Sequence, residues 1–254
     1  MSVANWLTAR PIAHRAFHDR THGRIENTIS AVTAAIEHDF SIEVDLQLTA
    51  DEQVIVFHDD RLDRLTESSG RVDRLNLTAL RAVSLRDTSD KILTLDELLE
   101  AVAGKVPLVL ELKSRWTGDR RLERAVATKL AGYSGLVAVM SFDPGAMRAM
   151  RHLVPHLPRG LVADRFSAAN WQGLSAFRRW TLRHLLASVY VMPEFIAFDV
   201  SALPATAPLL IRHVFGLPLL TWTVRAPGER ETASRWAGQM IFEGFNPDQL
   251  RSGA

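Results

Sequence analysis

Cysteine is the first residue that the sequence lacks: none of its 254 residues is a cysteine. This absence excludes disulfides, thiol catalysis and cysteine-ligated zinc or iron–sulfur sites. Any metal that the protein binds must therefore be held by oxygen atoms or by histidine.

A surplus of charge of one sign is missing as well. The chain has 30 Lys and Arg residues against 29 Asp and Glu residues, a formal net charge of +1. A nucleic-acid-binding surface needs a broad positive field, because phosphate contacts supply most of its affinity. We therefore expect no nucleic acid among the partners.

Long hydrophobic runs are absent too. No apolar run approaches the roughly 18 residues of a membrane-spanning helix. The first ten residues show neither the basic segment nor the apolar segment of a secretory signal. We expect no stable membrane insertion and a location in the cytoplasm.

What is present is a regular alternation of two kinds of segment. Short apolar runs typical of buried strands alternate with longer segments of helical period. Strands are expected near residues 11–14, 41–48, 107–112, 137–142, 159–164, 195–199, 218–223 and 240–243. Helices are expected near residues 28–38, 94–103, 119–131, 144–153, 170–187, 204–215 and 228–237.

Eight such units favour one α/β fold over the others. They fit a closed (β/α)8 TIM barrel, and 254 residues is the usual size of one such domain. An open doubly wound sheet fits less well, because the sequence has no glycine-rich phosphate loop of the G-x-G-x-x-G type. The prediction is a single barrel domain over residues 1–254.

One further strand-like run, residues 53–58, follows the second strand after too few residues for a parallel crossover. It is expected to fold back as a hairpin that pairs Val44 with His58 and Asp45 with Phe57. Residues 59–93 are then a probable insertion at the top of the barrel, with one short helix near 77–83.

Carboxylates occupy the inward face of two predicted strands. The strand over 41–49 alternates strictly, so Glu43 and Asp45 share a face opposite its apolar residues. On this strand alone, a polar face exposed to water is the stronger alternative. Glu111 lies on a very apolar strand, where a carboxylate adds nothing to packing, and so favours a site inside the barrel. Three converging carboxylates suit Mg²⁺ or Ca²⁺. Lys113 beside them could hold a phosphate oxygen or form a salt bridge to Glu111 or Asp45.

Two histidines are expected at the same end of the barrel. His14 follows the first strand, and the hairpin returns His58 to the level of the carboxylates. The C-terminal ends of barrel strands carry catalytic groups, and two histidines can act as base and acid near pH 7. A purely structural histidine is the alternative at each position.

These residues together resemble a known family. The ordered motifs resemble those of the glycerophosphodiester phosphodiesterases, a family of TIM barrels similar to phosphatidylinositol phosphodiesterases. The match is dense over residues 11–113, and later only residues 141–143 and Trp222 resemble it. The motifs are His14-Arg15, Glu26-Asn27-Thr28, Glu43-Val44-Asp45, Thr49-Ala50-Asp51, His58-Asp59 and Glu111-Leu112-Lys113.

The resemblance implies an activity and a role for each residue. In that family a glycerol hydroxyl attacks phosphorus, an alcohol leaves, and water opens the cyclic phosphate to glycerol 3-phosphate. The partner is a small-molecule phosphodiester, and the cofactor is one divalent cation, Mg²⁺ or Ca²⁺. The implied roles are acid/base catalysis by His14 and His58, metal binding by Glu43, Asp45 and Glu111, phosphate binding by Arg15 and Lys113, and contact with glycerol by Trp222.

The sequence departs from the family pattern in two places. Ala16 stands where the family usually has glycine, so its methyl group is expected to narrow the mouth or bar a turn with positive φ. Residues 242–247 lack the Thr-Asp pair that the family tends to show before a proline. Asn27 or Thr28 also has another interpretation, as the N-cap of the first helix.

Two other functions stay open. One is a phospholipase of the sphingomyelinase D or lysophospholipase D type, although the sphingomyelinase D group is typically secreted and disulfide-bearing. The other is a catalytically silent barrel that binds phosphodiesters, which would be expected to have lost one of the five acid/base and metal residues. The sequence leaves the oligomeric state open.

Overall fold

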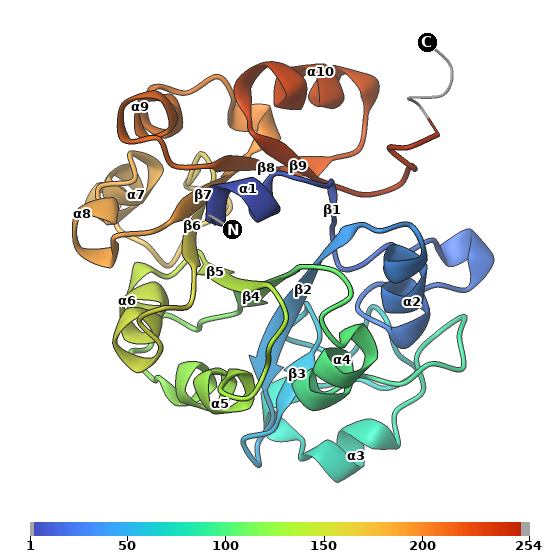
Figure 1. Cartoon of the computed structure of the whole chain (residues 1–254). Coiled ribbons are helices and arrows are strands. Elements are labelled where there is room, and N and C mark those ends of the chain that lie inside the picture. The colour runs from blue at the N-terminus through green and yellow to red at the C-terminus, as the bar shows by residue number, and fades with distance from the viewer. Residues whose placement is uncertain (1–2, 250–254) are drawn as a thin grey trace.

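Eight parallel strands close into a barrel in the computed structural model, which describes residues 3–249 (Figure 1). The strand order is β1-β9-β8-β7-β6-β5-β4-β2, and β1 pairs with β2 to complete the ring. The predicted (β/α)8 TIM barrel is confirmed. The ends of the predicted domain, residues 1–2 and 250–254, lie outside the described part of the chain.

Each barrel strand begins and ends within one residue of its predicted bounds. The barrel strands are β1 (Ile12–Ala13), β2 (Ser41–Leu48), β4 (Leu108–Leu112), β5 (Val137–Ser141), β6 (Arg159–Ala163), β7 (Phe195–Asp199), β8 (Leu219–Val224) and β9 (Gln239–Phe242). Apolar runs were sufficient to find them because both faces of a barrel strand are buried.

Helices lie around the outside of the barrel, except α1, which lies across it (Figure 1). They are α1 (Val3–Leu7), α2 (Ile29–Glu37), α3 (Leu77–Arg81), α4 (Leu95–Val102), α5 (Arg121–Leu130), α6 (Pro144–Leu153), α7 (Ala176–Arg183), α8 (Ser188–Val191), α9 (Thr206–Phe215) and α10 (Pro227–Trp236). Short 3-10 turns are η1 (Arg20–His22), η2 (Val72–Arg74) and η3 (Val200–Ala202).

The single helix predicted over 170–187 is wrong. Helix α7 covers only part of that range, and Leu185 takes the left-handed conformation with φ 56°, which ends a helix. Leu182 is the one residue that α7 buries, whereas Phe177 and Trp180 are 74% and 51% exposed. The segment therefore packs on the barrel through a few buried residues, such as Leu182 and Leu185, and not as one continuous helix.

Two apolar layers hold the barrel. Outward-facing side chains of the strands, such as Val44 on β2, pack against the helices. Inward-facing side chains such as Val109 form a second cluster that includes Trp6 and Leu7 of α1. Helix α1, which the sequence did not predict, thus packs against the barrel interior (Figure 1).

The predicted hairpin is confirmed. Strand β3 (Val54–Val56) runs antiparallel to β2 with Leu46 opposite Val56. Continuing this register places Asp45 opposite Phe57, and the Phe57 amide donates to the Asp45 carbonyl at 2.9 Å. Residues 59–93 follow with their own apolar cluster, which contains Phe57.

No helix among residues 3–249 is both long enough and apolar enough to cross a membrane.

Candidate active site

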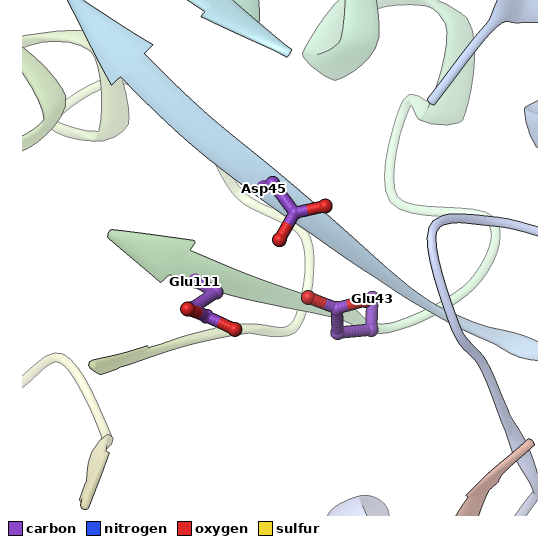
Figure 2. A group of neighbouring side chains, drawn as sticks. All are labelled: Glu43, Asp45 and Glu111. Atoms are coloured by element: carbon purple, nitrogen blue, oxygen red, sulfur yellow. The ribbon is translucent and has the colours of Figure 1, made fainter. Parts of the chain in front are cut away.

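The three predicted carboxylates meet inside the barrel. Glu43 and Asp45 lie on β2, and Glu111 lies directly opposite Asp45 on the neighbouring strand β4. All three are buried, and one oxygen from each lies within 4.8 Å of the others. Figure 2 shows the carboxyl groups facing one another across the two strands. The alternative of a water-exposed polar face is wrong, because barrel closure turns this face inward.

This arrangement is electrostatically unfavourable without a cation. Burial, followed by the charges of Asp45 and Glu111, raises the pKa of Glu43 well above its ordinary value. No described residue donates a hydrogen bond to Glu43 Oε1, which is buried. A buried carboxylate oxygen without a donor is costly, and a divalent cation would satisfy it. The donor set, carboxylate oxygens alone, fits a hard ion such as Mg²⁺ or Ca²⁺.

Lys113 supplies positive charge beside the carboxylates. Its Nζ lies 2.9 Å from Asp45 Oδ1 and donates to Glu111 Oε1 at 2.7 Å. Burial acts to lower the pKa of Lys113, but the two carboxylates outweigh it and raise that pKa. For Asp45, burial acts to raise the pKa, but Lys113, then His58 and Arg15, lower it below the ordinary range. The salt bridges considered for Lys113 are thus present in the structure.

His14 is held by a residue from the opposite end of the chain. Its backbone N–H donates to the Phe242 carbonyl at 2.9 Å, which places it at the closure between β1 and β9. Its ring Nδ1 lies 2.5 Å from Glu243 Oε2. Burial lowers the pKa of His14, and the hydrogen bond with Glu243 opposes that shift only in part. This leaves Nε2 as the ring nitrogen available to a substrate.

His58 is held in the same manner. Its Nδ1 lies 2.7 Å from Asp59 Oδ1, so Nε2 is again the available nitrogen. Both histidines line one cavity of about 360 Å³, together with Glu43, Glu111 and Lys113. The structure therefore brings the two predicted histidines and the carboxylates to a single space.

Arg15 joins the site through a network of charges. Its backbone N–H donates to Glu43 Oε2 at 2.9 Å, and its Nη1 donates to Glu26 Oε1 at 2.7 Å. Arg64, from the 59–93 segment, donates to both oxygens of Glu26 and to Asp59 Oδ2 at 2.6 Å. One network of ion pairs thus connects Arg15 to the carboxylate that holds His58.

Comparison with known proteins identifies the family. A model of the glycerophosphoryl diester phosphodiesterase family matches residues 14–251, nearly the whole chain. The chain belongs to this family. The glycerophosphodiester phosphodiesterase of Caldanaerobacter subterraneus is 31% identical over 147 residues, which are 54% of this chain and 60% of that protein. Glycerophosphodiester phosphodiesterase 1 of Bos taurus is 34% identical over 206 residues, 74% of this chain and 57% of that protein.

A solved structure agrees on the fold. The chain is similar to an Oleispira antarctica phosphodiesterase in complex with the product sn-glycerol-3-phosphate, with a TM-score of 0.79 over 98% of both chains. The sequence identity is 20%, so this likeness bears on the fold alone. The match of this chain covers less than two thirds of the length of the two curated relatives above.

Ala16 has a left-handed backbone conformation. Its φ is 64°, and that of Arg15 is 53°, so two consecutive residues are left-handed. Its backbone N–H donates to the Glu43 carbonyl at 2.9 Å, and its side chain is buried. The expectation that the methyl group bars this turn is wrong, because tertiary contacts compensate the left-handed conformation.

Asn27 contributes to the site and does not cap the first helix. Its Nδ2 donates to Asp45 Oδ2 at 2.9 Å. Thr28 occupies the N-cap position of α2 without a side-chain cap bond, because its hydroxyl donates to the Ile25 carbonyl at 2.8 Å. Thr28 is therefore the N-cap residue in position but not through its side chain, and the capping interpretation is wrong for Asn27.

Trp222 of β8 faces the cavity of about 360 Å³ and packs edge-on against Phe142, with ring centroids 5.5 Å apart. Trp222 thus packs against a neighbour and also lines the cavity, and its contact with glycerol stays a prediction. Among residues 3–249, nothing accepts a hydrogen bond from its buried Nε1. The indole N–H is thus a donor that a bound ligand could use.

Sequence reasoning assigned no role to Glu243 or Arg64, and it did not predict the contact between Asn27 and Asp45. Glu243 had a usable signal, a carboxylate at the C-terminal end of a barrel strand. For Arg64 there was no signal, because its position depends on how the 59–93 segment packs.

Proposed function

We propose that this protein hydrolyses glycerophosphodiesters to an alcohol and glycerol 3-phosphate with the help of one divalent cation, Mg²⁺ or Ca²⁺. The observation that carries the proposal is that Glu43 and Glu111, which cluster with Asp45, line one cavity with two carboxylate-held histidines. Such a set combines a cation site with a base and an acid, which phosphodiester cleavage requires.

The cation would be held by the carboxylates of Glu43, Asp45 and Glu111 and would polarise a phosphate oxygen and orient the attacking hydroxyl. Arg15 and Lys113 would bind the phosphate. The pKa of Arg15 is raised, since Asp45 and Glu26 outweigh its burial, so its guanidinium stays charged. Two fixed positive charges favour the negative charge that builds up at phosphorus.

His14 is the better candidate for the base. Burial lowers its pKa, so its ring is neutral at pH 7 and can take the proton of a glycerol hydroxyl. His58 then protonates the leaving oxygen. The glycerol oxygen bonds to phosphorus as the bond from phosphorus to the leaving alcohol breaks, which gives a cyclic phosphate. With the histidine roles reversed, water opens this ring to glycerol 3-phosphate.

Trp222 would bind the glycerol. Its ring offers an apolar face to the glycerol carbons, and its unpaired N–H can donate to a substrate oxygen.

The test is the release of glycerol 3-phosphate from glycerophosphocholine and glycerophosphoethanolamine, with Mg²⁺, with Ca²⁺ and with EDTA. We expect turnover only with metal, and its loss in His14→Ala and Glu43→Ala. Glu37→Ala, an exposed change on α2, should remain active. Turnover confined to lysophospholipids would instead favour the phospholipase. A folded, metal-binding protein without turnover on any diester would favour the silent barrel.

A further inference from the structure

Two cavities meet at the candidate active site. They share His58, Glu111, Lys113 and Phe142, and their volumes are about 360 Å³ and about 440 Å³. A phosphodiester carries two substituents on one phosphorus. A phosphate bound at the shared residues would therefore direct one substituent into each cavity.

The smaller cavity has the chemistry of a polyol site. Besides Trp222, it is lined by Asp199, Ser201 and Arg225, whose side chains can hydrogen-bond hydroxyl groups. Because it also contains His14 and Glu43, it suits the glycerol that carries the attacking hydroxyl. The leaving alcohol would then bind in the larger cavity.

The larger cavity has an aromatic wall. Trp116, from the loop after β4, and Trp171, from the segment after β6, both line it. Their ring centroids lie 5.9 Å apart, and Trp171 lies 5.2 Å from Phe142. Since Phe142 in turn contacts Trp222, a continuous row of aromatic rings runs from one cavity to the other.

The two tryptophan rings are fixed in place. Trp171 Nε1 donates to Asp164 Oδ2 at 2.9 Å, and the guanidinium of Arg178 lies over the Trp116 ring, 4.9 Å from its centroid. The backbone of Trp116 is left-handed, with φ 60°, an uncommon conformation for so large a residue. Preorganised rings of this kind lose little freedom when an apolar group packs on them.

The carboxylates of this cavity are already paired: Glu111 accepts from Lys113 at 2.7 Å, and the others lie beside arginines. Asp143 accepts from Arg120 at 3.0 Å, and Asp59 accepts from Arg64 at 2.6 Å. Asp60 is more exposed and has arginine nitrogens within 4.0 Å. A cationic leaving alcohol would therefore find no unpaired carboxylate among the described lining residues. A tryptophan face can itself bind a cation, but the guanidinium of Arg178 already lies over the Trp116 ring. The wall therefore favours an apolar group over a second cation.

We propose that the Trp116 and Trp171 wall is a subsite for the leaving alcohol and selects glycerophosphodiesters whose leaving alcohol carries an alkyl or aryl group. The inference rests on the proposed function above. His58 lines both cavities, so it can protonate the leaving oxygen while the apolar group of that alcohol lies against the rings.

The experiment compares three soluble diesters with metal present, all below the concentration at which they form micelles. They are glycerophosphocholine, the octyl ester of glycerol 3-phosphate, and an octanoyl lysophosphatidylcholine, which carries its chain on the glycerol. We expect kcat/KM for the octyl ester to exceed that for glycerophosphocholine about tenfold, mainly through a lower KM. The lysophospholipid should show no such gain.

Substitutions then assign the preference to the wall. Trp116→Ala and Trp171→Ala should each reduce the octyl-to-choline ratio of kcat/KM severalfold, and Trp116→Phe should restore part of it. Trp180→Ala, an exposed tryptophan on α7 that does not line the cavity, should leave the ratio as in the wild type. Circular dichroism identifies any variant that fails to fold. If Trp171→Ala does not fold, Trp116→Ala is sufficient for the test.

Three results would overturn the subsite. They are a ratio near one in the wild type, an unchanged ratio in both folded alanine variants, and a gain from the chain on the glycerol. In each case turnover itself persists, so the proposed function survives. Absence of turnover on every diester by a folded, metal-loaded protein would refute the proposed function and the subsite together.

Discussion

Two carboxylates hold the histidines of the site through the same ring atom. Asp59 bonds to Nδ1 of His58, and Glu243 bonds to Nδ1 of His14. Such a partner fixes both the tautomer and the orientation of an imidazole. Asp59 is adjacent in sequence to its histidine, whereas Glu243 is 229 residues away from His14. Glu243 is thus the more informative residue to change.

Glu243→Gln is expected to lower kcat by about 100-fold, because His14 loses the carboxylate that orients it. The hydrogen bond to Glu243 raises the pKa of His14 against the larger effect of burial. Removing that carboxylate therefore lowers the pKa further, and the acid limb of the profile of kcat/KM against pH should move to lower pH. The measurement is that profile for both proteins.

Glu231→Gln on α10 is the matched control, since it removes one carboxylate from an exposed position near the same end of the chain. Its pH profile should coincide with that of the wild type. An acid limb that moves to higher pH in Glu243→Gln would contradict the role given to Glu243.

At the scale of single elements, helix α4 has a well-defined start and an unfavourable end. Thr94 and Glu97 form a capping box at its N-terminus. Its C-cap, Ala103, is exposed and left-handed, with φ 47°. A left-handed conformation costs an L-residue about 1 to 2 kcal/mol, and glycine avoids that cost.

Ala103→Gly is therefore expected to raise the free energy of unfolding by up to about 1 kcal/mol, once the greater entropy of glycine in the unfolded chain is deducted. Urea denaturation measures the change. Ala131→Gly is the control, because Ala131 is the exposed C-cap of α5 and has ordinary right-handed helical angles. There glycine should destabilise by roughly 0.5 to 1 kcal/mol. The same sign for both changes would contradict this account.

The 59–93 segment is joined to the barrel by Arg64. Its guanidinium bonds to Glu26, the partner of Arg15, and to Asp59, the partner of His58. Arg64→Gln should lower kcat about tenfold, because it loosens the residues that orient His58 and Arg15. Stability should change little, since Arg64 is about half exposed. Arg61→Gln, which breaks the exposed pair with Asp63, serves as the control and should change neither.

At the scale of the whole molecule, the sequence predicted the strands and the hairpin, which depend on local patterns. It missed the contacts that form only when the first and last strands of the barrel pair. Alternation along β2 placed Glu43 and Asp45 inside the barrel, and turn length set the hairpin register. The contact between His14 and Glu243 exists only because β1 pairs with β9, a pairing that no local pattern encodes. The break at Leu185 and the left-handed turn at Ala16 likewise follow from tertiary contacts that override residue preference.

Closure also concentrates negative charge in the centre of the barrel, and this predicts that metal binding and folding are linked. A cation that binds only the folded chain at 100 times its Kd adds about 2.7 kcal/mol of stability. For a domain of this size we expect a rise in Tm of about 5 to 10 °C from EDTA to saturating Mg²⁺ or Ca²⁺. Scanning calorimetry in both conditions measures the shift.

Glu43→Gln distinguishes the repulsion among the buried carboxylates from their binding of the metal. In EDTA this variant should melt above the wild type, because it removes a carboxyl group whose ionisation in the fold is disfavoured by burial and by the charges of Asp45 and Glu111. With metal it should show little or no rise, because a ligand has been lost. Glu100→Gln, an exposed change on α4, should follow the wild type in both conditions. If Glu43→Gln melted below the wild type in EDTA, the buried Glu43 carboxyl group would not be a source of instability in the metal-free barrel.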